Sequence, residues 1–392
     1  MAQPERIALA FPLGMPHHEL LIEGVLAYAR EHGRQWSFLT APESMTLSIL
    51  DLRGWQGAGI IAKLNLPAEA RFAASLDIPI VNVSGALRKS PVPRVTVDNR
   101  KIGRLAAEHL LDAGFRHLAF YGVRRTGYSH LREVGFRRRL DEAGMDCAVL
   151  RAATTFRTRG NRWFDQHQDL IRWIGKLEKP LGLFVVSDYR ARLVIDACQQ
   201  HGLNVPEDVA LVSVDNERTI CEHCEPKLTS IDRNARLVGY RSAEVLDGMI
   251  RGHQPQPREI LIPPKALVAR ASSDTLAVDD PRLREAIAFI QNHLSESLKI
   301  EDILTHTGMS RRWLEYAFRE YMGESPHQYI GRKRVLAAKE LLQEEPDLKL
   351  HEVAAQTGFT RPKQLTLAFQ RYEGMSPREF RHASEANDLP TE

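Results

Sequence analysis

The chain has 392 residues, of which 43% are hydrophobic and 26% are charged, and its formal net charge at pH 7 is +3. This composition predicts an ordinary folded protein with room for two or three domains, and the small net charge argues against a protein that binds polyanions without selectivity. No stretch approaches the roughly 18 consecutive apolar residues of a membrane span. Glu5 and Arg6 stand where a signal peptide has its apolar core. We therefore expect a cytoplasmic protein that makes no membrane contact.

The first two thirds of the chain alternate short apolar segments with amphipathic ones. The apolar segments predict buried strands at residues 6–11, 57–62, 78–83, 94–98, 118–121, 182–186 and 209–214. The amphipathic segments predict helices at residues 17–33, around 47, and at 68–76, 99–113, 130–143, 166–176 and 189–201. Such alternation is typical of a parallel sheet wrapped by helices, and there are more units than one compact sheet holds. We expect an α/β domain with two lobes that face each other across a cleft.

Three aspartates, Asp98, Asp188 and Asp215, stand at or just after the ends of predicted strands. Open parallel sheets bind ligands beyond the carboxyl ends of their strands. Carboxylates accept hydrogen bonds from adjacent sugar hydroxyls, and an arginine such as Arg132 or Arg190 can donate to ring or hydroxyl oxygens. Each aspartate could instead cap a helix. Three aspartates with the same placement favour a polyol site.

The familiar catalytic motifs are missing from this region. No glycine-rich phosphate loop follows a predicted strand, and the motifs of serine hydrolases and zinc proteases do not occur. The alternative to a sensor is a sugar-processing enzyme with carboxylates such as Asp188 and Asp215 as catalytic groups, or a plain sugar-binding protein with a helical appendage. Aromatic side chains that could line the site or belong to the core are Trp55, Trp163 and Trp173.

The cysteines are too few and too scattered for a disulfide scaffold; they are Cys147, Cys198, Cys221 and Cys224. Cys221 and Cys224 form a lone CxxC pair, and no second ligand pair with zinc spacing follows them. We interpret the thiols as structural or incidental, with metal binding or redox sensing as the less favoured alternative. No metal or cofactor is expected.

One sequence pattern occurs twice between residues 300 and 381. Each copy has a turn glycine, then a leucine and a phenylalanine one helical turn apart, then a glycine five residues later. The two sets are Gly308, Leu314, Phe318, Gly323 and Gly358, Leu365, Phe369, Gly374. This spacing predicts two helix-turn-helix units, with an architectural repeat in a helical bundle as the alternative. A helix from residue 326 to about 343 would separate them, with a buried stripe of Ile330, Val335, Ala338 and Leu342.

The outward faces of the second helices carry the side chains expected to meet double-stranded DNA. They are Ser310, Arg311, Arg312, Glu315 and Tyr316 in the first unit, and Thr360, Arg361, Lys363 and Thr366 in the second. Arginine and lysine bond guanine edges or phosphates, and Ser310 and Thr360 are expected near the helix N-caps. Residues 281–392 hold 16 Lys and Arg against 17 Asp and Glu. Affinity for DNA must therefore come from local placement of cations.

This tandem unit resembles the AraC-type DNA-binding domain over roughly residues 280–385. The residues that carry the resemblance are Gly308-x-Ser310, Phe318, Gly323-x-Ser325-Pro326, Gly358-Phe359, Phe369 and Gly374-x-Ser376-Pro377. The resemblance implies two recognition helices in successive major grooves of an operator. Gln364-Leu365 departs from the aromatic residues that are common there, although leucine still fills a core position.

Residues of about 5–275 resemble the ligand-binding domain of LacI/GalR regulators and the related periplasmic sugar-binding fold. The motifs are Val97-Asp98-Asn99, Arg132-x-x-Gly135-Phe136, Val214-Asp215-Asn216 and Leu228-Thr229-Ser230-Ile231. This resemblance implies effector contacts at Asp98, Arg132 and Asp215, with Asp188 and Arg190 from the adjacent loop. Asn216 and, in the first loop, His17 complete the expected ligand site.

A sensor of this kind followed by an AraC-type domain resembles the xylose operon regulators (XylR type). That resemblance implies a DNA-binding activator that responds to a pentose (xylose-like) effector, forms a homodimer through the sensor and contacts RNA polymerase. We expect the sensor at residues 1–275, a linker at 276–280, the DNA-binding domain at 281–385 and a tail at 386–392. Lobe crossings are expected near Asp98, Leu228 and Pro263-Pro264. Asp280 should cap a helix whose buried face is Leu283, Ile287, Ile290 and Leu294.

Overall fold

The computed structural model describes residues 4–42, 46–153, 162–255, 258–275, 280–345 and 347–385. The chain divides into two compact units. An N-terminal unit comprises residues 1–111 and 115–275, and a C-terminal unit comprises residues 112–114 and 276–392. Apart from Asp280, the expected linker lies outside the described residues, and so does the expected tail.

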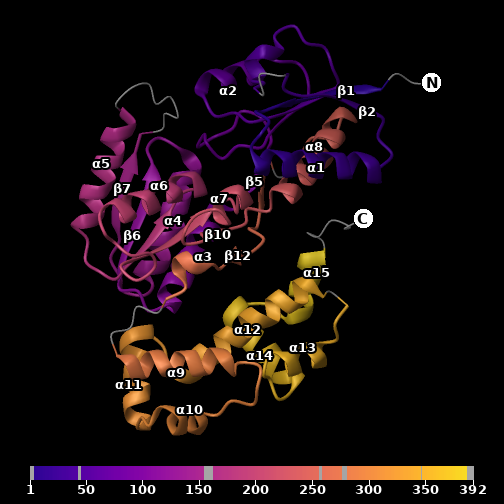
Figure 1. Cartoon of the computed structure of the whole chain (residues 1–392). Coiled ribbons are helices and arrows are strands. Elements are labelled where there is room, and N and C mark those ends of the chain that lie inside the picture. Colours follow the sequence, from indigo (N-terminus) through magenta and orange to yellow (C-terminus); the bar gives the residue numbers. More distant parts are fainter. Residues whose placement is uncertain are drawn as a thin grey trace. The chain divides into compact units, whose positions relative to one another are not determined.

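The N-terminal unit contains two six-stranded sheets, one in each lobe (Figure 1). The first has the order β11-β5-β4-β3-β1-β2. Its strands are β1 (Glu5–Ala10), β2 (Trp36–Leu39), β3 (Gly59–Ala62), β4 (Ile80–Asn82), β5 (Arg94–Val97) and β11 (Glu259–Ile262). All its pairings are parallel, with Ile7 opposite Gly59 and Glu259 opposite Arg94.

The second sheet has the order β12-β10-β9-β8-β6-β7. Its strands are β6 (His117–Val123), β7 (Ala148–Ala152), β8 (Leu181–Val185), β9 (Val209–Val214), β10 (Thr229–Ile231) and β12 (Leu267–Val268). Only β12 runs antiparallel to its neighbour. The expected two-lobed α/β fold is confirmed. The chain crosses between sheets after β5, after β10 and between β11 and β12, close to the predicted points.

Helices cover both sheets. The first lobe has α1 (Pro16–Glu31), α2 (Pro67–Ala74), α8 (Ala235–Ile250) and the 3-10 helix Ile49–Leu52. The second has α3 (Asn99–Asp112), α4 (Gly127–Asp141), α5 (Arg162–Gly175), α6 (Asp188–Gln200), α7 (Arg218–Cys221) and the 3-10 helix Ala271–Ser273. The helix expected around residue 47 is therefore a short 3-10 turn that begins two residues later. The edge strands β2 and β7 escape prediction because they are half-buried and lack a continuous apolar run.

Glycines let two helix pairs approach closely. A Cβ on Gly24 would lie 1.9 Å from the Arg236 carbonyl oxygen, which holds α1 against α8 backbone to backbone. A Cβ on Gly103 would lie 2.0 Å from the Arg132 carbonyl oxygen, so α3 and α4 pack in the same way. This second contact fixes the part of α4 that carries the Arg132 side chain.

The C-terminal unit is entirely helical within the described residues. Its helices are α9 (Pro281–Asn292), α10 (Ile300–Thr307), α11 (Arg311–Met322), α12 (Pro326–Glu344), α13 (Leu350–Gln356), α14 (Pro362–Glu373) and α15 (Pro377–Glu385). Helix α12 contributes Ile330 to one hydrophobic core and Val335, Ala338 and Leu342 to another. The predicted buried stripe is confirmed, and it joins two small cores built around Phe318 and Phe369.

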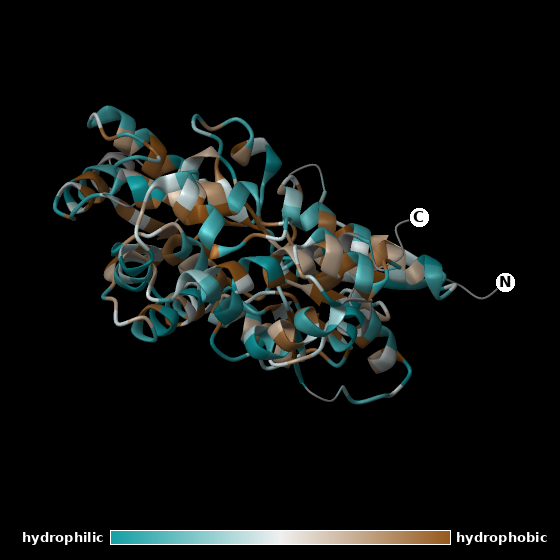
Figure 2. Ribbon diagram, turned by 90° about the horizontal axis from the view of Figure 1, so that it is seen from below, coloured by the Kyte–Doolittle hydropathy of each residue, from teal (hydrophilic) through white to brown (hydrophobic). Residues whose placement is uncertain are grey.

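The start of the C-terminal unit also follows the prediction. The Asp280 carboxylate accepts from the Arg282 amide and caps α9, and Leu283, Ile287 and Ile290 are fully buried. The prediction is wrong for Leu294, which lies beyond the end of α9 at Asn292 and is half-buried against the same core. In Figure 2 many helices change from teal to brown around their circumference, as amphipathic helices do. Within the described ranges, no helix is both long and apolar enough to cross a membrane.

Candidate ligand site and nucleic-acid interface

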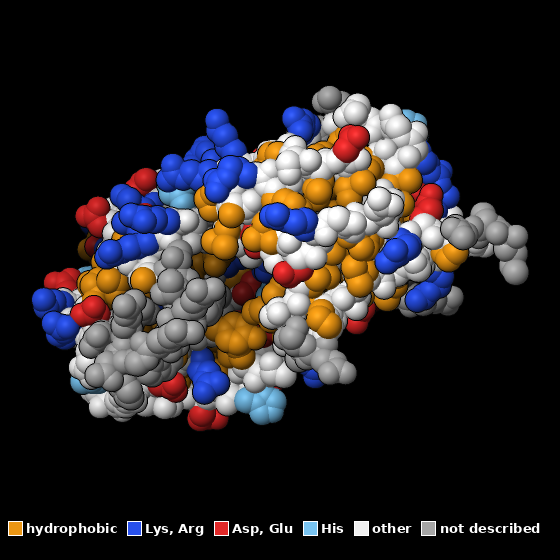
Figure 3. Space-filling view, turned by 90° about the horizontal axis from the view of Figure 1, so that it is seen from above, with side chains coloured by type: hydrophobic (Ala, Val, Ile, Leu, Met, Phe, Trp, Pro, Cys, Tyr) orange, Lys and Arg blue, Asp and Glu red, His pale blue; other side chains and the backbone are white. Residues whose placement is uncertain are grey.

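The charged centre of the N-terminal unit is assembled by both lobes. His17 at the start of α1 and Lys63 after β3 come from the first lobe. Arg132 on α4 and the segment that follows β9 come from the second lobe. Arg233 lies in the crossing between β10 and α8. A hollow with acidic and basic side chains at its bottom is visible from above (Figure 3).

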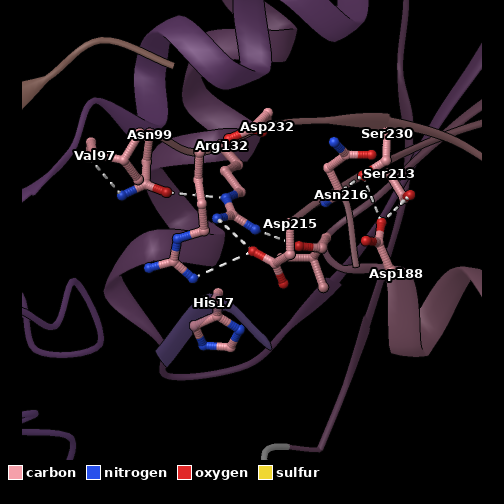
Figure 4. A network of polar contacts seen from close by, with 12 residues as sticks. His17, Val97, Asn99, Arg132, Asp188, Ser213, Asp215, Asn216, Ser230 and Asp232 are labelled. Atoms are coloured by element: carbon pink, nitrogen blue, oxygen red, sulfur yellow. Dashed lines mark hydrogen bonds and ion pairs between the residues drawn. The ribbon is translucent and has the colours of Figure 1, made fainter. Parts of the chain in front are cut away.

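The Arg132 guanidinium is buried and held from two sides. Its Nε donates to the Asn99 Oδ1 at 2.9 Å, and Nη1 donates to the Val186 carbonyl oxygen (Figure 4). Its Nη2 lies 3.9 Å from Asp215 Oδ1, which also accepts from Arg233 Nη1 at 3.2 Å. Burial lowers the pKa of Arg132 to about 10, so the guanidinium remains charged at neutral pH. Asp215 is therefore placed between two cations.

A second pair joins the lobes directly. His17 Nδ1 lies 2.6 Å from Glu217 Oε1, and both side chains are buried. Burial is the main cause of the lowered pKa of His17 and of the pKa of about 7 for Glu217. The other atoms of the pair, His17 Nε2 and Glu217 Oε2, are buried without a hydrogen-bond partner among the described residues, as is Arg233 Nε. Buried polar atoms are nearly always paired, so three such atoms around one cleft indicate a site for a polar ligand.

Lys63 and His18 form the first-lobe wall of this site. The Pro12 carbonyl oxygen can only accept, so its 2.6 Å contact with His18 Nδ1 places the ring proton on Nδ1. His18 Nε2 then accepts from Lys63 Nζ at 2.7 Å. Burial lowers the pKa of His18 to about 3 and that of Lys63 to about 8. The wall thus consists of a neutral imidazole and an ammonium that is still largely charged at neutral pH.

Asp188 has a different environment from Asp215. Its fully buried carboxylate accepts from the Ser213 and Ser230 hydroxyls, from the Glu217 amide at 2.8 Å and from the Cys221 thiol at 3.4 Å. Burial, followed by the charge of Asp215, raises its pKa. In Figure 4 the carboxylate points toward Ser213 and Ser230. Its acceptor capacity is occupied by the protein, which ties α6 to β9 and β10 and leaves little for a sugar.

Three other expected ligand contacts are also engaged with the protein. Asp98 Oδ1 accepts from the amides of residues 100 and 101 at 3.0 and 3.1 Å, which is the helix-cap alternative. The Asn216 Oδ1 accepts from Arg270 at 2.9 Å. Arg190 donates to the Tyr121 hydroxyl and to the Ala153 carbonyl oxygen, each at 3.1 Å. These contacts turn the polar ends of all three side chains toward protein partners.

The tryptophans and cysteines belong largely to the cores. Trp55 and Trp173 pack against hydrophobic clusters of the first and second lobe, and the side chain of Trp163 lies outside the described residues. Cys221 and Cys224 are buried in the second-lobe core, and burial raises the pKa of both thiols. A raised pKa keeps a thiol protonated and unreactive, in line with the structural interpretation.

The first helix-turn-helix unit has its expected geometry. Gly308 adopts a left-handed conformation (φ 66°) at the end of α10, and the Ser310 hydroxyl caps α11 by accepting from the Trp313 amide. Leu314 and Phe318 face the core. The opposite face presents Arg311, which pairs with Glu301 at 3.3 Å, together with Arg312, Glu315 and Tyr316. Arg312 is exposed and has no ion pair or hydrogen bond within the described residues.

The second unit differs at its N-cap. Helix α14 begins at Pro362, its N-cap residue is Arg361, and no side chain caps it. Thr360 therefore lies beside the N-cap, as predicted, but its hydroxyl does not cap the helix, because Pro362 sets the first helical turn and places the start one residue later. Lys363 is exposed, and the Thr366 hydroxyl donates to the Pro362 carbonyl oxygen at 3.1 Å.

Sequence reasoning missed several residues of the cleft. Glu217, Lys63 and Arg233 lie in loops, and no periodic pattern marks them. The sequence included Asn99 in a motif but did not predict its role, which is to position Arg132 through the side-chain amide oxygen. A useful signal would have been the position of Lys63 directly after a buried strand, the same placement that identified the aspartates.

Comparisons with known proteins agree with this architecture. Residues 107–273 match the periplasmic binding protein-like domain, and residues 303–383 match a helix-turn-helix domain. The xylose operon regulatory protein of Escherichia coli (strain K12) is 27% identical over 96% of both chains, and that of Haemophilus influenzae is 26% identical over 96% of this chain and 98% of the relative. The solved structure of the xylose-binding transcription activator xylR is 26% identical, with a TM-score of 0.63 over 97% of this chain and 99% of the other.

These relatives are transcription regulators, not enzymes. The chain is therefore a XylR-like DNA-binding transcription regulator, in which a periplasmic-binding-protein-like sensor is fused to an AraC-type helix-turn-helix domain.

Proposed function

We propose that the protein is a sugar-responsive regulator, in the manner of the xylose operon regulators, and that the effector binds in the interlobe cleft. The observation that carries this proposal is a set of three buried atoms that have no hydrogen-bond partner in the described part of the chain, namely His17 Nε2, Glu217 Oε2 and Arg233 Nε. They surround the Arg132–Asp215 pair, and each can accept from or donate to a hydroxyl.

Within this site, Arg132, Asp215 and His17 contact the effector together with Glu217 and Arg233. Asp188, Asp98, Asn216 and Arg190 act behind them as supports, because their polar atoms are engaged by the protein. We expect the sugar to be a pentose such as xylose, which appears in the names of the relatives.

The DNA contacts come from Ser310, Arg311, Arg312, Glu315 and Tyr316 of the first unit and from Thr360, Arg361, Lys363 and Thr366 of the second. Recognition helices about 34 Å apart reach successive major grooves on one face of the duplex. The boundaries fit a sensor at 1–275, a linker at 276–280, a DNA-binding domain at 281–385 and a tail at 386–392.

Regulation follows from closure of the lobes. The His17–Glu217 bond already crosses the cleft, and a sugar that bonds groups of both lobes stabilises the closed state. In a homodimer formed through the sensor, closure would move the two DNA-binding domains and favour an activating contact with RNA polymerase in the cytoplasm. The size of the response is limited by the differential affinity of the sugar for the two states.

The test is calorimetric titration of a pentose panel against the full chain and an Asp215→Ala variant. Loss of a carboxylate that accepts hydroxyl bonds should weaken binding by roughly 1.5–3 kcal/mol, or about 10- to 150-fold. Asp141→Ala, at the exposed end of α4, is the matched control and should bind as the unmodified protein does. Unchanged affinity in Asp215→Ala would remove this residue from the site.

A further inference from the structure

Among the described residues, the two most exposed large hydrophobic side chains both lie in the helix-turn-helix units. They are Tyr316 in α11 and Leu367 in α14, and each is 62% exposed. A single exposed apolar side chain is common on protein surfaces and needs no explanation. Two of them in the second helices of a tandem repeat call for a common cause.

Tyr316 and Leu367 occupy the same position of the repeat. Each is the sixth residue of its helix, two positions after a buried leucine and two positions before a buried phenylalanine. Because successive residues of an α-helix are rotated by about 100°, this position lies roughly 180° from the leucine–phenylalanine stripe. Packing within the unit therefore does not require an apolar side chain there, and a role toward a binding partner accounts for both.

Cations flank both side chains along the outward face of each helix, one turn before and one turn after. They are Arg312 and Arg319 in α11, and Lys363 and Arg371 in α14, and all four are exposed. Glu320 also lies one turn after Tyr316, whereas the positions one turn away from Leu367 hold no carboxylate. The core of a protein interface is depleted of charged residues. In a major groove the same cations face phosphates while the side chain between them faces base edges, so the pattern favours DNA as the partner.

The chemistry of the two side chains selects the base. The Leu367 side chain has no hydrogen-bond donor or acceptor, so it recognises a base only by apolar contact. Thymine presents an apolar group in the major groove, its C5 methyl, whereas the major-groove edges of adenine, guanine and cytosine offer donors and acceptors. The Tyr316 ring offers a similar apolar surface, with a hydroxyl at its tip.

We propose that Tyr316 and Leu367 each pack against the C5 methyl group of a thymine, so that the operator carries a thymine at the same place relative to each recognition helix. This inference rests on the proposed function, since it assigns a base to the two helices proposed to enter the major groove. Burial of one methyl group contributes a modest free energy, so these contacts set base preference while the flanking cations supply most of the affinity.

The experiment replaces single thymines of the operator by deoxyuridine, which lacks the C5 methyl group and pairs with adenine in the same way. The operator is a duplex that the full chain selects from a random pool, and affinity is measured by electrophoretic retardation. For each recognition helix, replacement of one thymine should weaken binding by about 3- to 5-fold, as the loss of one buried methyl group implies. At the same positions, a pair of 5-methylcytosine with guanine should bind more tightly than a pair of cytosine with guanine, because it restores the methyl group.

Two variants assign each thymine to its helix. Leu367→Ala should remove the sensitivity to deoxyuridine at one position and leave it at the other, and Tyr316→Ala should do the reverse. Tyr316→Phe keeps the ring and should keep the sensitivity. Leu336→Ala, at a leucine of α12 that is 41% exposed, is the matched control and should bind every duplex as the unmodified chain does.

The outcomes separate the thymine contacts from the proposed DNA interface. If no deoxyuridine weakens binding, or if the sensitivity persists in both alanine variants, the thymine assignment is wrong and the interface stands, because the chain still binds the selected duplex. If both alanine variants bind every duplex normally but no longer activate transcription by RNA polymerase, the two side chains meet a protein and the assignment is again wrong. If the full chain retards no duplex of the pool, the proposed interface fails and the assignment fails with it.

Discussion

The two units of the chain place their functional side chains in opposite ways. In the C-terminal unit the residues proposed to meet DNA are exposed or half-exposed, and in each helix-turn-helix unit they lie within a few positions of one another at the start of one helix. In the N-terminal unit the cleft residues are buried and come from segments as far apart as His17 and Glu217, which are 200 positions apart. A helical site is thus fixed by local periodicity, whereas a cleft site is fixed by topology.

The largest effect should come from the cores of the two helix-turn-helix units. Phe318→Ala and Phe369→Ala each remove a fully buried ring and should destabilise the C-terminal unit by about 3–5 kcal/mol. Tyr316→Ala, on a side chain that is 62% exposed, is the control and should change stability by less than about 0.5 kcal/mol. Thermal unfolding is the measurement. Equal effects of Phe318→Ala and Tyr316→Ala would contradict the assignment of the two helix faces.

The next test compares Asp98 and Asp188, which have the same placement at the ends of predicted strands. Asp188→Ala leaves two hydroxyls, an amide and a thiol without their acceptor and should destabilise the N-terminal unit by about 2–4 kcal/mol. Asp98→Ala removes only a helix cap and should cost about 1 kcal/mol. Urea unfolding of both variants compares them. A larger effect for Asp98→Ala would mean that the Asp188 network is not structural.

These contrasts show what the sequence could predict. Continuous apolar runs identified most of the strands, and the repeat identified both helix-turn-helix units. The sequence could not distinguish Asp98 from Asp188, because both stand at strand ends and differ only in the donors that the fold brings to them. The sequence did not identify Lys63 and Arg233 as residues of the ligand site, because both lie in loops and reach the cleft only when the two lobes come together. The sequence places both Ser310 and Thr360 near helix N-caps, but only Ser310 caps its helix, because Pro362 makes Arg361 the N-cap residue of α14.

A third prediction concerns the exposed faces of α11 and α14. Arg312→Ala and Lys363→Ala should each lose about 1–3 kcal/mol at the cognate operator, with relaxed preference at one base pair if the contact is to a base. A phosphate contact would weaken all sequences alike and make the salt dependence shallower. Arg30→Ala, which removes an exposed cation from the sensor, is the control. Binding to single-base operator variants at two salt concentrations distinguishes these cases, and unchanged affinity in both variants would refute the proposed interface.

The smallest expected effect is on the pH dependence of stability. The pKa of His18 is lowered to about 3 in the folded state, so the unfolded chain takes up a proton first as pH falls below 6.5. Stability is then present above pH 6.5 and is lost toward pH 3. His17 acts in the same direction, whereas Glu217, with a pKa of about 7, and Asp188, whose pKa is also raised, favour the folded state at low pH. The two histidines and the two carboxyl groups act in opposite directions and largely offset each other between pH 6.5 and 4.5, so the net change is small and the contribution of His18 is found by removing its side chain.

The check is urea unfolding at pH 6.5 and 5.5, with His18→Gln as the comparison. The variant should lose less stability on acidification than the unmodified chain, by about 1 kcal/mol over this unit. Identical pH profiles would show that His18 is not held neutral in the folded protein.

The most direct test of the account is a measurement of coupling between the two units. DNA duplexes selected by the full chain from a random pool serve as the operator, and operator affinity is measured by electrophoretic retardation with and without the tightest-binding sugar of the pentose panel. We expect the ligand to change operator affinity at least about 5-fold, and we expect Asp215→Ala to remove this change but not the basal DNA binding. Equal operator affinity with and without a ligand that demonstrably fills the cleft would contradict it.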